Sequence, residues 1–211
     1  MTTDAVRDAF ALSLGACRGN EAELGRLDAV AGDGDHGSGM VRGFTAACAS
    51  ITGLEDAASS IKTAGFAFAD AAGGASGALW GAFIQTVGRA LGEGAITAVR
   101  VAAALRSGQA QIERIGKSQR GDKTLLDTLG PFLDALDTQL SGGATLSQSW
   151  AEALVVAREA TEATAKMVAR RGRSAVLGDR SLGTVDPGAR SMLYVLEAVL
   201  PVIAKEEVVP L

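Results

Sequence analysis

The stretch LWGAFIQTV at residues 79–87 shows most clearly which fold the chain adopts. Its apolar side chains return after three or four positions, which is the repeat of one face of an α-helix and not the alternation of a β-strand. These side chains are Leu79, Trp80, Phe83, Ile84 and Val87. The stretch therefore predicts an amphipathic helix whose apolar face packs into a core.

The same spacing recurs on both sides of this stretch and predicts about eight or nine helices. They lie at 6–17, 20–31, 40–48, 61–68, 79–87, 96–115, 123–140, 146–170 and 188–204. No segment alternates apolar and polar residues between turn signals, which argues against a sheet. Because no linker-like composition or repeat divides the 211 residues, the sequence predicts a single all-α domain over 1–211.

Composition limits the partners and the compartment of the chain. Apolar residues make up 47% of it but aromatic residues only 4%, so the core is built mainly from Ala, Leu and Val, as in closely packed helices. A net charge of −4 without a run of Lys or Arg argues against nucleic acid as a partner, because a phosphate backbone needs clustered cations. No apolar run reaches about 20 residues and the N-terminus lacks the features of a signal peptide, so we expect a cytoplasmic protein that does not enter a membrane.

Glycine is concentrated in four segments between the predicted helices. They are GDGDHG at 32–37, GGASG at 73–77, GKSQRG at 116–121 and RGRSAVLGDRSLGTVDPG at 171–188. Glycine lets a backbone approach a ligand closely, and a helix that begins after such a loop offers unpaired N–H groups and the positive end of its dipole to an anion. A helical bundle also needs glycine at its turns, but most of these segments carry charged or hydroxyl groups as well. We therefore expect the functional residues in these loops.

Three aspartates stand close together around the first of these segments. Asp28, Asp33 and Asp35 are near neighbours in the sequence, and such carboxylates repel one another unless a cation lies between them. Hard oxygen ligands favour magnesium, calcium or manganese over zinc, and magnesium commonly shares its shell with phosphate oxygens. The sequence therefore predicts a site for magnesium and phosphate. The alternative is a solvated acidic turn in which Asp35 is the N-cap of the next helix.

Three familiar nucleotide or calcium motifs are matched only in part. Residues 32–37 fit G-x-G-x-x-G, but that fingerprint must follow a strand, and aspartates at two variable positions would repel a bare pyrophosphate. An EF-hand loop beginning at Asp33 has Phe44 instead of Glu at its twelfth position. A P-loop ending at Gly116 lacks its first glycine, since that position holds Gln111. The common nucleotide-binding folds are therefore excluded.

Other candidate phosphate ligands lie near predicted helix starts. His36 is the only histidine of the chain, which excludes a multi-histidine zinc site. It is placed either to donate to a phosphate oxygen or simply to cap its helix. Ser76 and the amides around it also precede a helix and are placed to bind phosphate. Asp186-Pro187-Gly188 by itself is a structural signature, an N-cap residue followed by proline, and needs no ligand.

Taken together, these segments resemble one family, the nucleotide-binding L subunits (DhaL) of dihydroxyacetone kinases, which correspond to the C-terminal nucleotide domain of the fused kinases. The matching segments follow the family's order and span nearly the whole chain. They are LDAVAGDGDHG at 27–37, GGASG at 73–77, GDKT at 121–124 with Asp127, and GRS at 172–174 followed by LGDRSLGTVDPGA at 177–189. Each motif alone is modest, whereas four of them in order are highly specific.

The resemblance implies an eight-helix antiparallel barrel with the nucleotide lying across one end. It implies that Asp28, Asp33 and Asp35 coordinate two Mg²⁺ ions that bridge to the phosphates of ADP or ATP. Three carboxylates and a diphosphate carry about six negative charges, of which two such ions offset about four. The resemblance assigns no catalytic side chain. Around the nucleotide it places His36, Gly37, Ser38, Gly39, Ala75, Ser76, Gly116, Leu125, Arg173, Asp186, Pro187 and Gly188.

The chain departs from the family pattern at two positions. The family often has an aromatic residue near Val176 and a histidine where this chain has Thr184. The first difference is harmless, and the second bears on the loop near the nucleotide. Neither position touches the magnesium ligands.

The resemblance also implies a partner, because the family binds its sugar through a histidine on a separate subunit or domain. We therefore expect a sugar-binding kinase subunit. Either ADP stays bound as a fixed cofactor that a phosphotransferase-system protein rephosphorylates, or ATP exchanges as in an ordinary kinase. A chain that ends at Leu211 without a sugar domain favours the first version. The alternatives are a kinase subunit for another short keto sugar such as erythrulose, and a nucleotide-dependent protein that binds a regulator.

Overall fold

The structure, a computed structural model, describes residues 2–92, 94–172, 175 and 181–208, and within these ranges it contains nine α-helices, one short 3₁₀ helix and no strand. The helices are α1 (Thr3–Gly19), α2 (Glu21–Ala29), α3 (His36–Ser50), α4 (Ala57–Ala72), α5 (Gly74–Leu91), α6 (Ala98–Gly116), α7 (Leu126–Ser141), α8 (Leu146–Ala163), η1 (Thr164–Lys166) and α9 (Pro187–Val208). The predicted all-α fold is confirmed.

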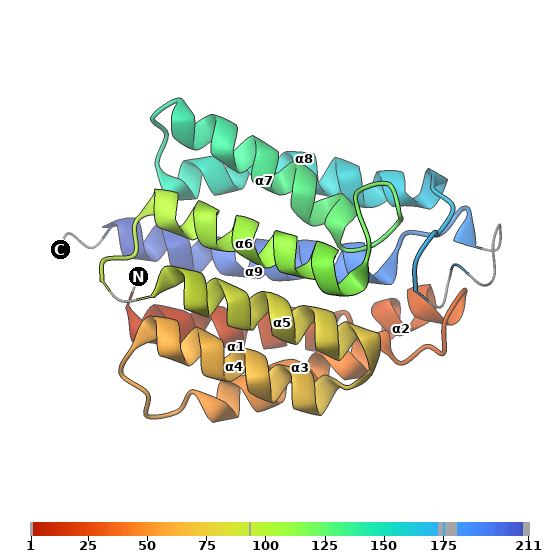
Figure 1. The fold of residues 1–211 in the computed structure, drawn as a ribbon, viewed down its shortest axis with the longest axis horizontal. Helices are drawn as coiled ribbons and strands as arrows, with labels where there is room; N and C mark the ends of the chain where they lie inside the picture. Colours follow the sequence, from red (N-terminus) through yellow and green to blue (C-terminus); the bar gives the residue numbers. More distant parts are fainter. Residues whose placement is uncertain (1, 93, 173–174, 176–180, 209–211) are drawn as a thin grey trace.

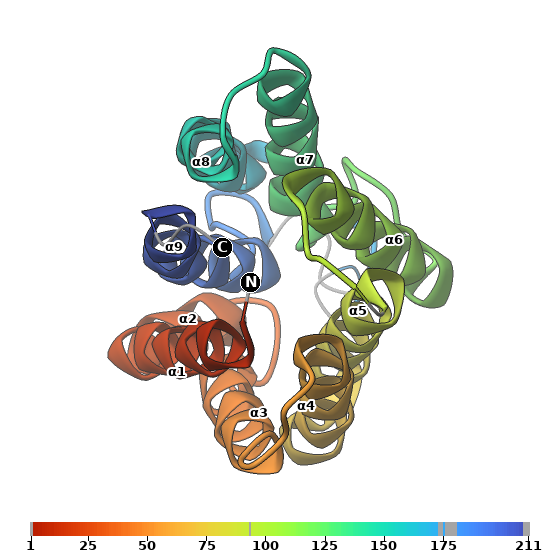
Figure 2. The same ribbon diagram turned by 90° about the vertical axis from the view of Figure 1, so that its left-hand side faces the viewer.

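Eight of these helices form a closed antiparallel ring (Figures 1 and 2). From α3 to α9 each helix packs against the next one in the chain, and α9 packs back against α1, which in turn contacts α3. The short helix α2 lies at one end, beside α3 and α9. The predicted eight-helix antiparallel barrel is therefore confirmed, with α2 as an addition to the ring.

The alternating direction of the helices places every second connection at the same end of the barrel. The connections α1–α2–α3, α4–α5, α6–α7 and α8–α9 all lie at the right-hand end of Figure 1. We call this the loop end; its described residues are 20–35, 73, 117–125, 164–172, 175 and 181–186. Each of the four glycine-rich segments of the sequence falls in one of these connections or at the helix ends beside it.

Several observed helices extend a few residues beyond the predicted ranges, whereas two predicted helices run well past an observed end, each for a local reason. The helix predicted from residue 123 begins at Leu126, because Lys123 has a left-handed backbone with φ +62°. The helix predicted over 146–170 ends at Ala163. There the Thr164 hydroxyl donates to the Thr161 carbonyl and accepts the Asp186 N–H, which turns the chain toward the start of α9.

The interior of the barrel is filled by a small aromatic cluster and by closely packed helices. The rings of Phe44 and Phe68 meet edge to face with centroids 5.0 Å apart, and Trp80 lies beside both. The helices α4 and α5 approach closely because Gly65 and Gly81 face each other across their interface: a Cβ added to Gly81 would lie 2.8 Å from the Gly65 carbonyl oxygen. Nearer the loop end, a Cβ added to Gly77 would lie 3.1 Å from the Ala69 carbonyl oxygen, so the start of α5 also packs closely against the end of α4.

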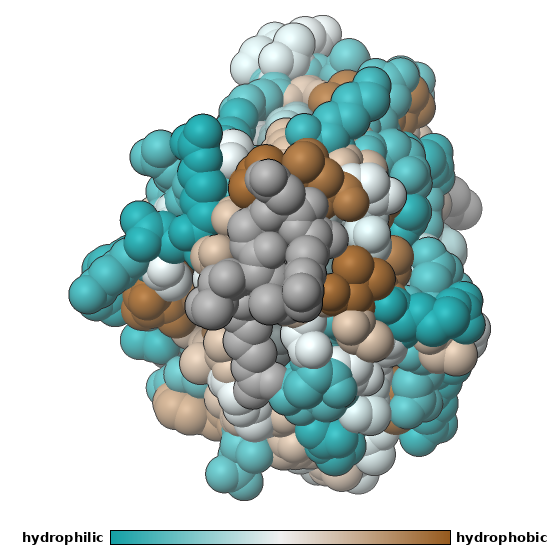
Figure 3. Space-filling model, turned by 90° about the vertical axis from the view of Figure 1, so that its right-hand side faces the viewer, coloured by the Kyte–Doolittle hydropathy of each residue, from teal (hydrophilic) through white to brown (hydrophobic). Residues whose placement is uncertain are grey.

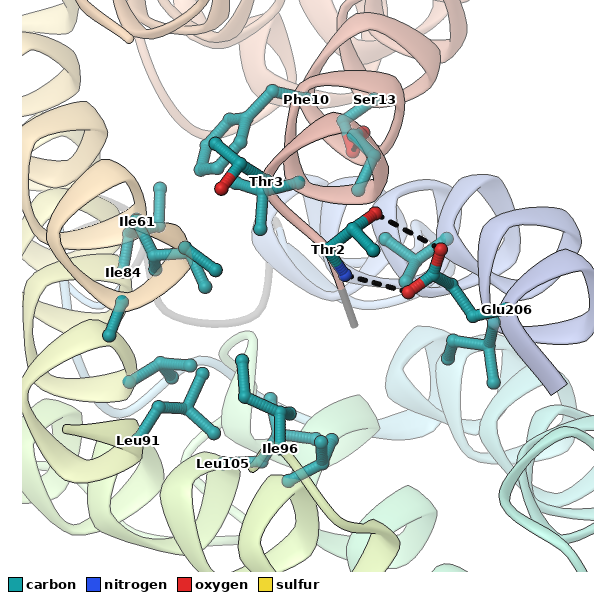
Figure 4. A pocket seen from close by; sticks show the side chains of 18 of the residues that line it. Thr2, Thr3, Phe10, Ser13, Ile61, Ile84, Leu91, Ile96, Leu105 and Glu206 are labelled. Atoms are coloured by element: carbon teal, nitrogen blue, oxygen red, sulfur yellow. Dashed lines mark hydrogen bonds between the residues drawn. The ribbon is translucent and has the colours of Figure 1, made fainter. Parts of the chain in front are cut away.

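The opposite end of the barrel, where the described chain begins and α9 ends, is less completely filled. A cavity of about 690 Å³ lies there, lined mostly by apolar side chains that include Phe10, Ile84, Leu91 and Leu105 (Figure 4). At its rim the Thr2 amide donates to the Glu206 carboxylate over 2.7 Å. None of the candidate site residues predicted from the sequence lines this cavity.

One helix meets the length and composition of a membrane span, contrary to the expectation that no segment of the chain does so. It is the Pro187–Glu207 part of α9, with a mean hydropathy of 1.2. In the structure α9 packs against α1, α2, α7 and α8 and buries Met192, Leu193 and Leu196. These contacts are those of a helix in the wall of a bundle.

Candidate functional site

The three aspartates predicted as metal ligands come together at the loop end. Asp28 lies on the last turn of α2, and Asp33 and Asp35 lie in the loop that leads to α3. One carboxylate oxygen from each lies within 4.8 Å of the other two. Asp28 is half-buried, whereas Asp33 and Asp35 are exposed. Three anionic oxygens at this separation can share one or more hard cations, and magnesium or calcium prefers this donor set.

Two glycines shape the loop around the Asp28 carboxylate. Gly34 has φ +79°, a left-handed conformation that glycine adopts readily, and its N–H donates to Asp28 Oδ2 over 2.8 Å. A Cβ added to Gly32 would lie only 2.3 Å from Asp28 Oδ1. The glycine density seen in the sequence therefore has a local cause, because the loop folds directly over one of its own carboxylates.

Two helix starts at the loop end lack the side-chain cap that each described helix start at the opposite end has. At the end opposite the loop end, each starting helix is capped by a side-chain oxygen that accepts a first-turn N–H. These caps are Thr2, Asp56, Thr97 and Thr145. Among the described helix starts at the loop end, the N-cap residues of α3 and α5, Asp35 and Gly73, make no side-chain cap hydrogen bond. Asp35 therefore has the N-cap position that the alternative interpretation expected, but its carboxylate does not cap the helix.

The first turns of α3 and α5 lie side by side and carry many of the predicted phosphate ligands. Gly37, Ser38 and Gly39 are on α3, and Ala75 and Ser76 are on α5. Each turn directs backbone N–H groups and the positive end of a helix dipole toward the loop end. Two such turns beside three carboxylates form a combined site for an anion and a cation.

His36 is buried and links three helices at this site. Its Nδ1 lies 3.1 Å from Ser76 Oγ and its Nε2 lies 2.9 Å from Ser191 Oγ, so the ring joins α3, α5 and α9. Ser191 Oγ in turn donates to the Gly188 carbonyl. Burial lowers the pKa of His36 below its usual 6.5, against the opposing charge of Asp28. Since both ring nitrogens are engaged, a direct contact of the ring with phosphate would have to replace one of these hydrogen bonds.

The turn Asp186-Pro187-Gly188 begins α9 as its sequence predicted. Asp186 Oδ2 accepts the Ala189 N–H over 2.8 Å, and Pro187 is the first helical residue. Burial raises the pKa of Asp186 to about 7, and Lys123 opposes that shift. Gly188 lies against Leu125, because a Cβ on this glycine would be 3.5 Å from the Leu125 amide nitrogen. Two segments predicted to surround the nucleotide are therefore in contact.

The positions of the remaining predicted residues say less about the nucleotide site. Gly116 ends α6, where a Cβ would lie 3.2 Å from Leu79 Cδ2, so it borders the first turns of α5. Arg173 lies outside the described residues. The sequence analysis assigned no role to Lys123, although its motif was noted. The sequence carried no signal for it beyond the GDKT motif, because its burial and its contacts depend on the folded chain.

Known proteins of similar sequence match most of this chain. A protein-family model described as the DAK2 domain matches residues 30–201. The L-erythrulose 1-kinase of Mycolicibacterium smegmatis is 47% identical over an alignment of 192 positions, and the match covers 86% of this chain but only 32% of that kinase. The PTS-dependent dihydroxyacetone kinase ADP-binding subunit DhaL of Lactococcus lactis is 32% identical over 88% of this chain and 90% of the subunit.

A solved structure has the same fold. The dihydroxyacetone kinase of C. freundii in complex with AMP-PNP and Mg²⁺ superposes with a TM-score of 0.65 at 28% identity, covering 93% of this chain and 33% of that protein. The chain thus spans about a third of the length of the erythrulose and C. freundii kinases, and most of the DhaL subunit. It belongs to the DAK2 domain family, and ADP-binding DhaL subunits of dihydroxyacetone kinases are its homologues.

Proposed function

We propose that this chain binds an adenine nucleotide through Mg²⁺ at the loop end and serves as the phosphoryl donor for dihydroxyacetone held on a sugar-binding partner. The observation that carries the proposal is the convergence of Asp28, Asp33 and Asp35 within 4.8 Å, beside the first turns of α3 and α5. Carboxylates suit a divalent cation, and the N–H groups of a helix start suit a phosphate. Both features are explained if the cation and a polyphosphate bind together.

The residues of the site fit magnesium as well as phosphate. The carboxylates are hard oxygen donors, and the Gly34 N–H holds Asp28 in place before any ion binds. Mg²⁺ held by these groups would neutralise phosphate charge and make the terminal phosphorus easier to attack. Two ions in this position agree with the charge balance of three carboxylates and a diphosphate.

The chain's own groups would position the phosphates. The amides of Gly37 and Ser38 and of Ala75 and Ser76 would donate to phosphate oxygens, because those helix starts have no side-chain cap of their own. The Gly39 N–H already donates to the Asp35 carbonyl over 2.8 Å. His36 would keep the two turns in register through its hydrogen bond to Ser76. Catalysis of phosphoryl transfer rests mainly on such positioning and charge stabilisation.

The partner would dock at the loop end, where the donor phosphate is exposed. Figure 3 shows this face as a largely hydrophilic surface with several hydrophobic groups beside the grey residues. Val30, Val168 and Leu182 are between 38% and 44% exposed and belong to loop-end segments. Scattered apolar groups around a polar site suit a protein contact that excludes water during transfer.

A second candidate substrate is favoured by a specific observation. Kinases for L- and D-erythrulose are 41% to 47% identical to this chain, against 31% to 34% for the DhaL subunits. Erythrulose is a keto sugar with one more carbon than dihydroxyacetone, so the same donor site would serve it. The recharging of the donor also has two versions. Either ADP stays bound and a phosphotransferase-system protein recharges it, or ATP exchanges.

The metal role is tested by calorimetric titration of ADP into the purified protein with and without Mg²⁺. We expect magnesium-dependent binding that Asp33→Asn weakens by about tenfold or more, because one hard anionic ligand is lost. Asp8→Asn, an exposed carboxylate on α1 that pairs with Lys205, is the control and should bind like the wild type. Equal affinity in Asp33→Asn and wild type, or binding independent of Mg²⁺, would refute the proposal.

A further inference from the structure

Lys123 is a buried lysine whose ammonium group contacts one distant segment three times. Its side chain is only 4% exposed. The Nζ donates to the carbonyl oxygens of Met167 over 3.1 Å and Thr184 over 2.8 Å, and also to that of Ser181. All three acceptors belong to the connection between α8 and α9, more than 40 residues further along the chain. The ammonium has three donors, and each is used on this connection.

The neighbours of Lys123 strengthen the same link. The Arg170 N–H donates to the Asp122 carbonyl over 3.0 Å, and Arg171 Nε lies 3.6 Å from Asp122 Oδ2. Two residues after Lys123, Leu125 touches Gly188 at the start of α9. The turn at 121–125 therefore holds the described part of the α8–α9 connection both at 167–171 and at 181–184.

The cost of this arrangement points to a purpose beyond ordinary packing. A buried ammonium loses its hydration and needs compensating hydrogen bonds. An apolar side chain at this position would fill the same space without that cost, but it could not bind three carbonyl oxygens from one segment. What the lysine adds is a defined position for the α8–α9 connection, which leads directly into Asp186-Pro187-Gly188.

We propose that Lys123 is a positioning residue that fixes the α8–α9 connection against the nucleotide site and thereby sets how tightly the nucleotide is retained. This inference rests on the proposed function for the identity of the ligand. Lys123 contacts neither the acidic loop nor the first turns of α3 and α5 through any hydrogen bond described above. Its loss should therefore affect nucleotide binding while the affinity of the acidic loop for a metal ion alone is retained.

The test uses the full chain with Lys123→Met, which keeps the length of the stem, and Lys123→Arg, which keeps the charge but has a planar fork that cannot place three donors around one nitrogen. Hydrogen exchange of the nucleotide-free protein is measured for peptides covering 164–172 and 181–187. The dissociation constant of ADP is measured with Mg²⁺, and the affinity for Mn²⁺ alone by electron paramagnetic resonance. Far-UV circular dichroism checks the helices.

For Lys123→Met we expect faster exchange in these peptides, an ADP dissociation constant raised by about tenfold, and unchanged Mn²⁺ affinity and helix content. For Lys123→Arg we expect an exchange rate and an ADP dissociation constant between those of Lys123→Met and the wild type. If Lys123→Met does not fold, the Lys123→Arg measurements test the inference. Unchanged exchange and ADP affinity, or equal losses of Mn²⁺ and ADP binding, would overturn the inference. If wild-type protein binds no ADP, the proposed function fails, whereas the exchange data still decide whether Lys123 holds the connection.

Discussion

Gly32 determines whether the Asp28 carboxylate can face the other two acidic residues. Because a Cβ here would lie 2.3 Å from Asp28 Oδ1 and 2.9 Å from the Asp28 carbonyl oxygen, Gly32→Ala must move that carboxylate. We expect magnesium-dependent ADP affinity to fall by about tenfold, while the free energy of unfolding falls by only about 1 kcal/mol. Gly19→Ala, with no atom near its added Cβ, is the matched control in calorimetry and urea unfolding. Wild-type affinity in Gly32→Ala would show that Asp28 is not a ligand.

Asp186 gives the nucleotide-free protein a definite pH dependence. Burial raises its pKa from 3.8 in the unfolded chain to about 7, so the folded state keeps a proton that the unfolded state loses between about pH 4 and pH 7. The free energy of unfolding should therefore fall as the pH rises through this window, by at most a few kcal/mol at about 1.4 kcal/mol per pKa unit. Asp186→Asn keeps an N-cap side chain and should remove this component. Urea unfolding of both proteins at pH 5 and pH 8 measures it; parallel profiles would contradict the assignment.

At the scale of single residues, the sequence predicted contacts that are local and missed those that depend on the closed ring. Asp28, Asp33 and Asp35 were recognisable because they are neighbours in the chain. The burial of His36 was not, since its partners Ser76 and Ser191 are 40 and 155 positions away. Lys123 was missed for the same reason: its acceptors come close only when the turn before α7 and the α8–α9 connection lie side by side.

Among the helices, the pair α4–α5 depends on glycines whose role periodicity could not reveal. A Cβ on Gly81 would lie 2.4 Å from Ala69 Cβ and 2.8 Å from the Gly65 carbonyl oxygen, so the two backbones are nearly in contact. Gly81→Ala should lower the free energy of unfolding by about 1–3 kcal/mol through overpacking. Gly15→Ala, on the open face of α1, should be neutral or stabilising. Thermal and urea unfolding decide this; equal stability of Gly81→Ala and wild type would mean that the helices separate at no cost.

The starts of α6 and α8 were predicted closely, whereas two boundaries at the loop end were missed because that end imposes its own geometry. Thr97 and Thr145 cap α6 and α8, close to the starts that periodicity suggested. The start of α7 was placed too early, because the left-handed Lys123 resembles an ordinary helix residue in the sequence. The end of α8 was placed too late, because Thr164 turns the chain through hydrogen bonds that only the folded protein contains.

For the molecule as a whole, the number and alternating direction of the helices locate the site, and the individual helix boundaries do not. Once the helices alternate in direction, the glycine-rich connections must share one end, which is why a scattered set of motifs becomes one site (Figure 1). The cavity of about 690 Å³ at the opposite end could not be predicted, since an apolar helix face looks the same in sequence whether it packs tightly or leaves space. The two ends therefore differ in kind: one is polar and shaped by loops, the other apolar and shaped by helix faces.

The proposed donor site at the loop end raises the question of which protein surface holds the sugar. A donor site needs an acceptor held in line with it. The single histidine of the chain, His36, is buried with both nitrogens hydrogen-bonded. It is therefore in no position to hold a keto sugar, which supports the proposal that a partner presents the acceptor.

We therefore expect the isolated chain, loaded with Mg²⁺ and ATP, to form no sugar phosphate from free dihydroxyacetone or erythrulose above background. Adding a sugar-binding kinase subunit should raise the rate by about a hundredfold or more, because the partner aligns the sugar hydroxyl with the terminal phosphate and excludes water. Each sugar is assayed with each of two recharging systems, ATP alone and a phosphotransferase-system protein with bound ADP. Since the sugar contacts would lie on the partner, exchanging a dihydroxyacetone-binding subunit for an erythrulose-binding one should change the preferred sugar while this chain stays the same. Rapid turnover by the isolated chain would require a sugar pocket within it and would overturn the two-component mechanism.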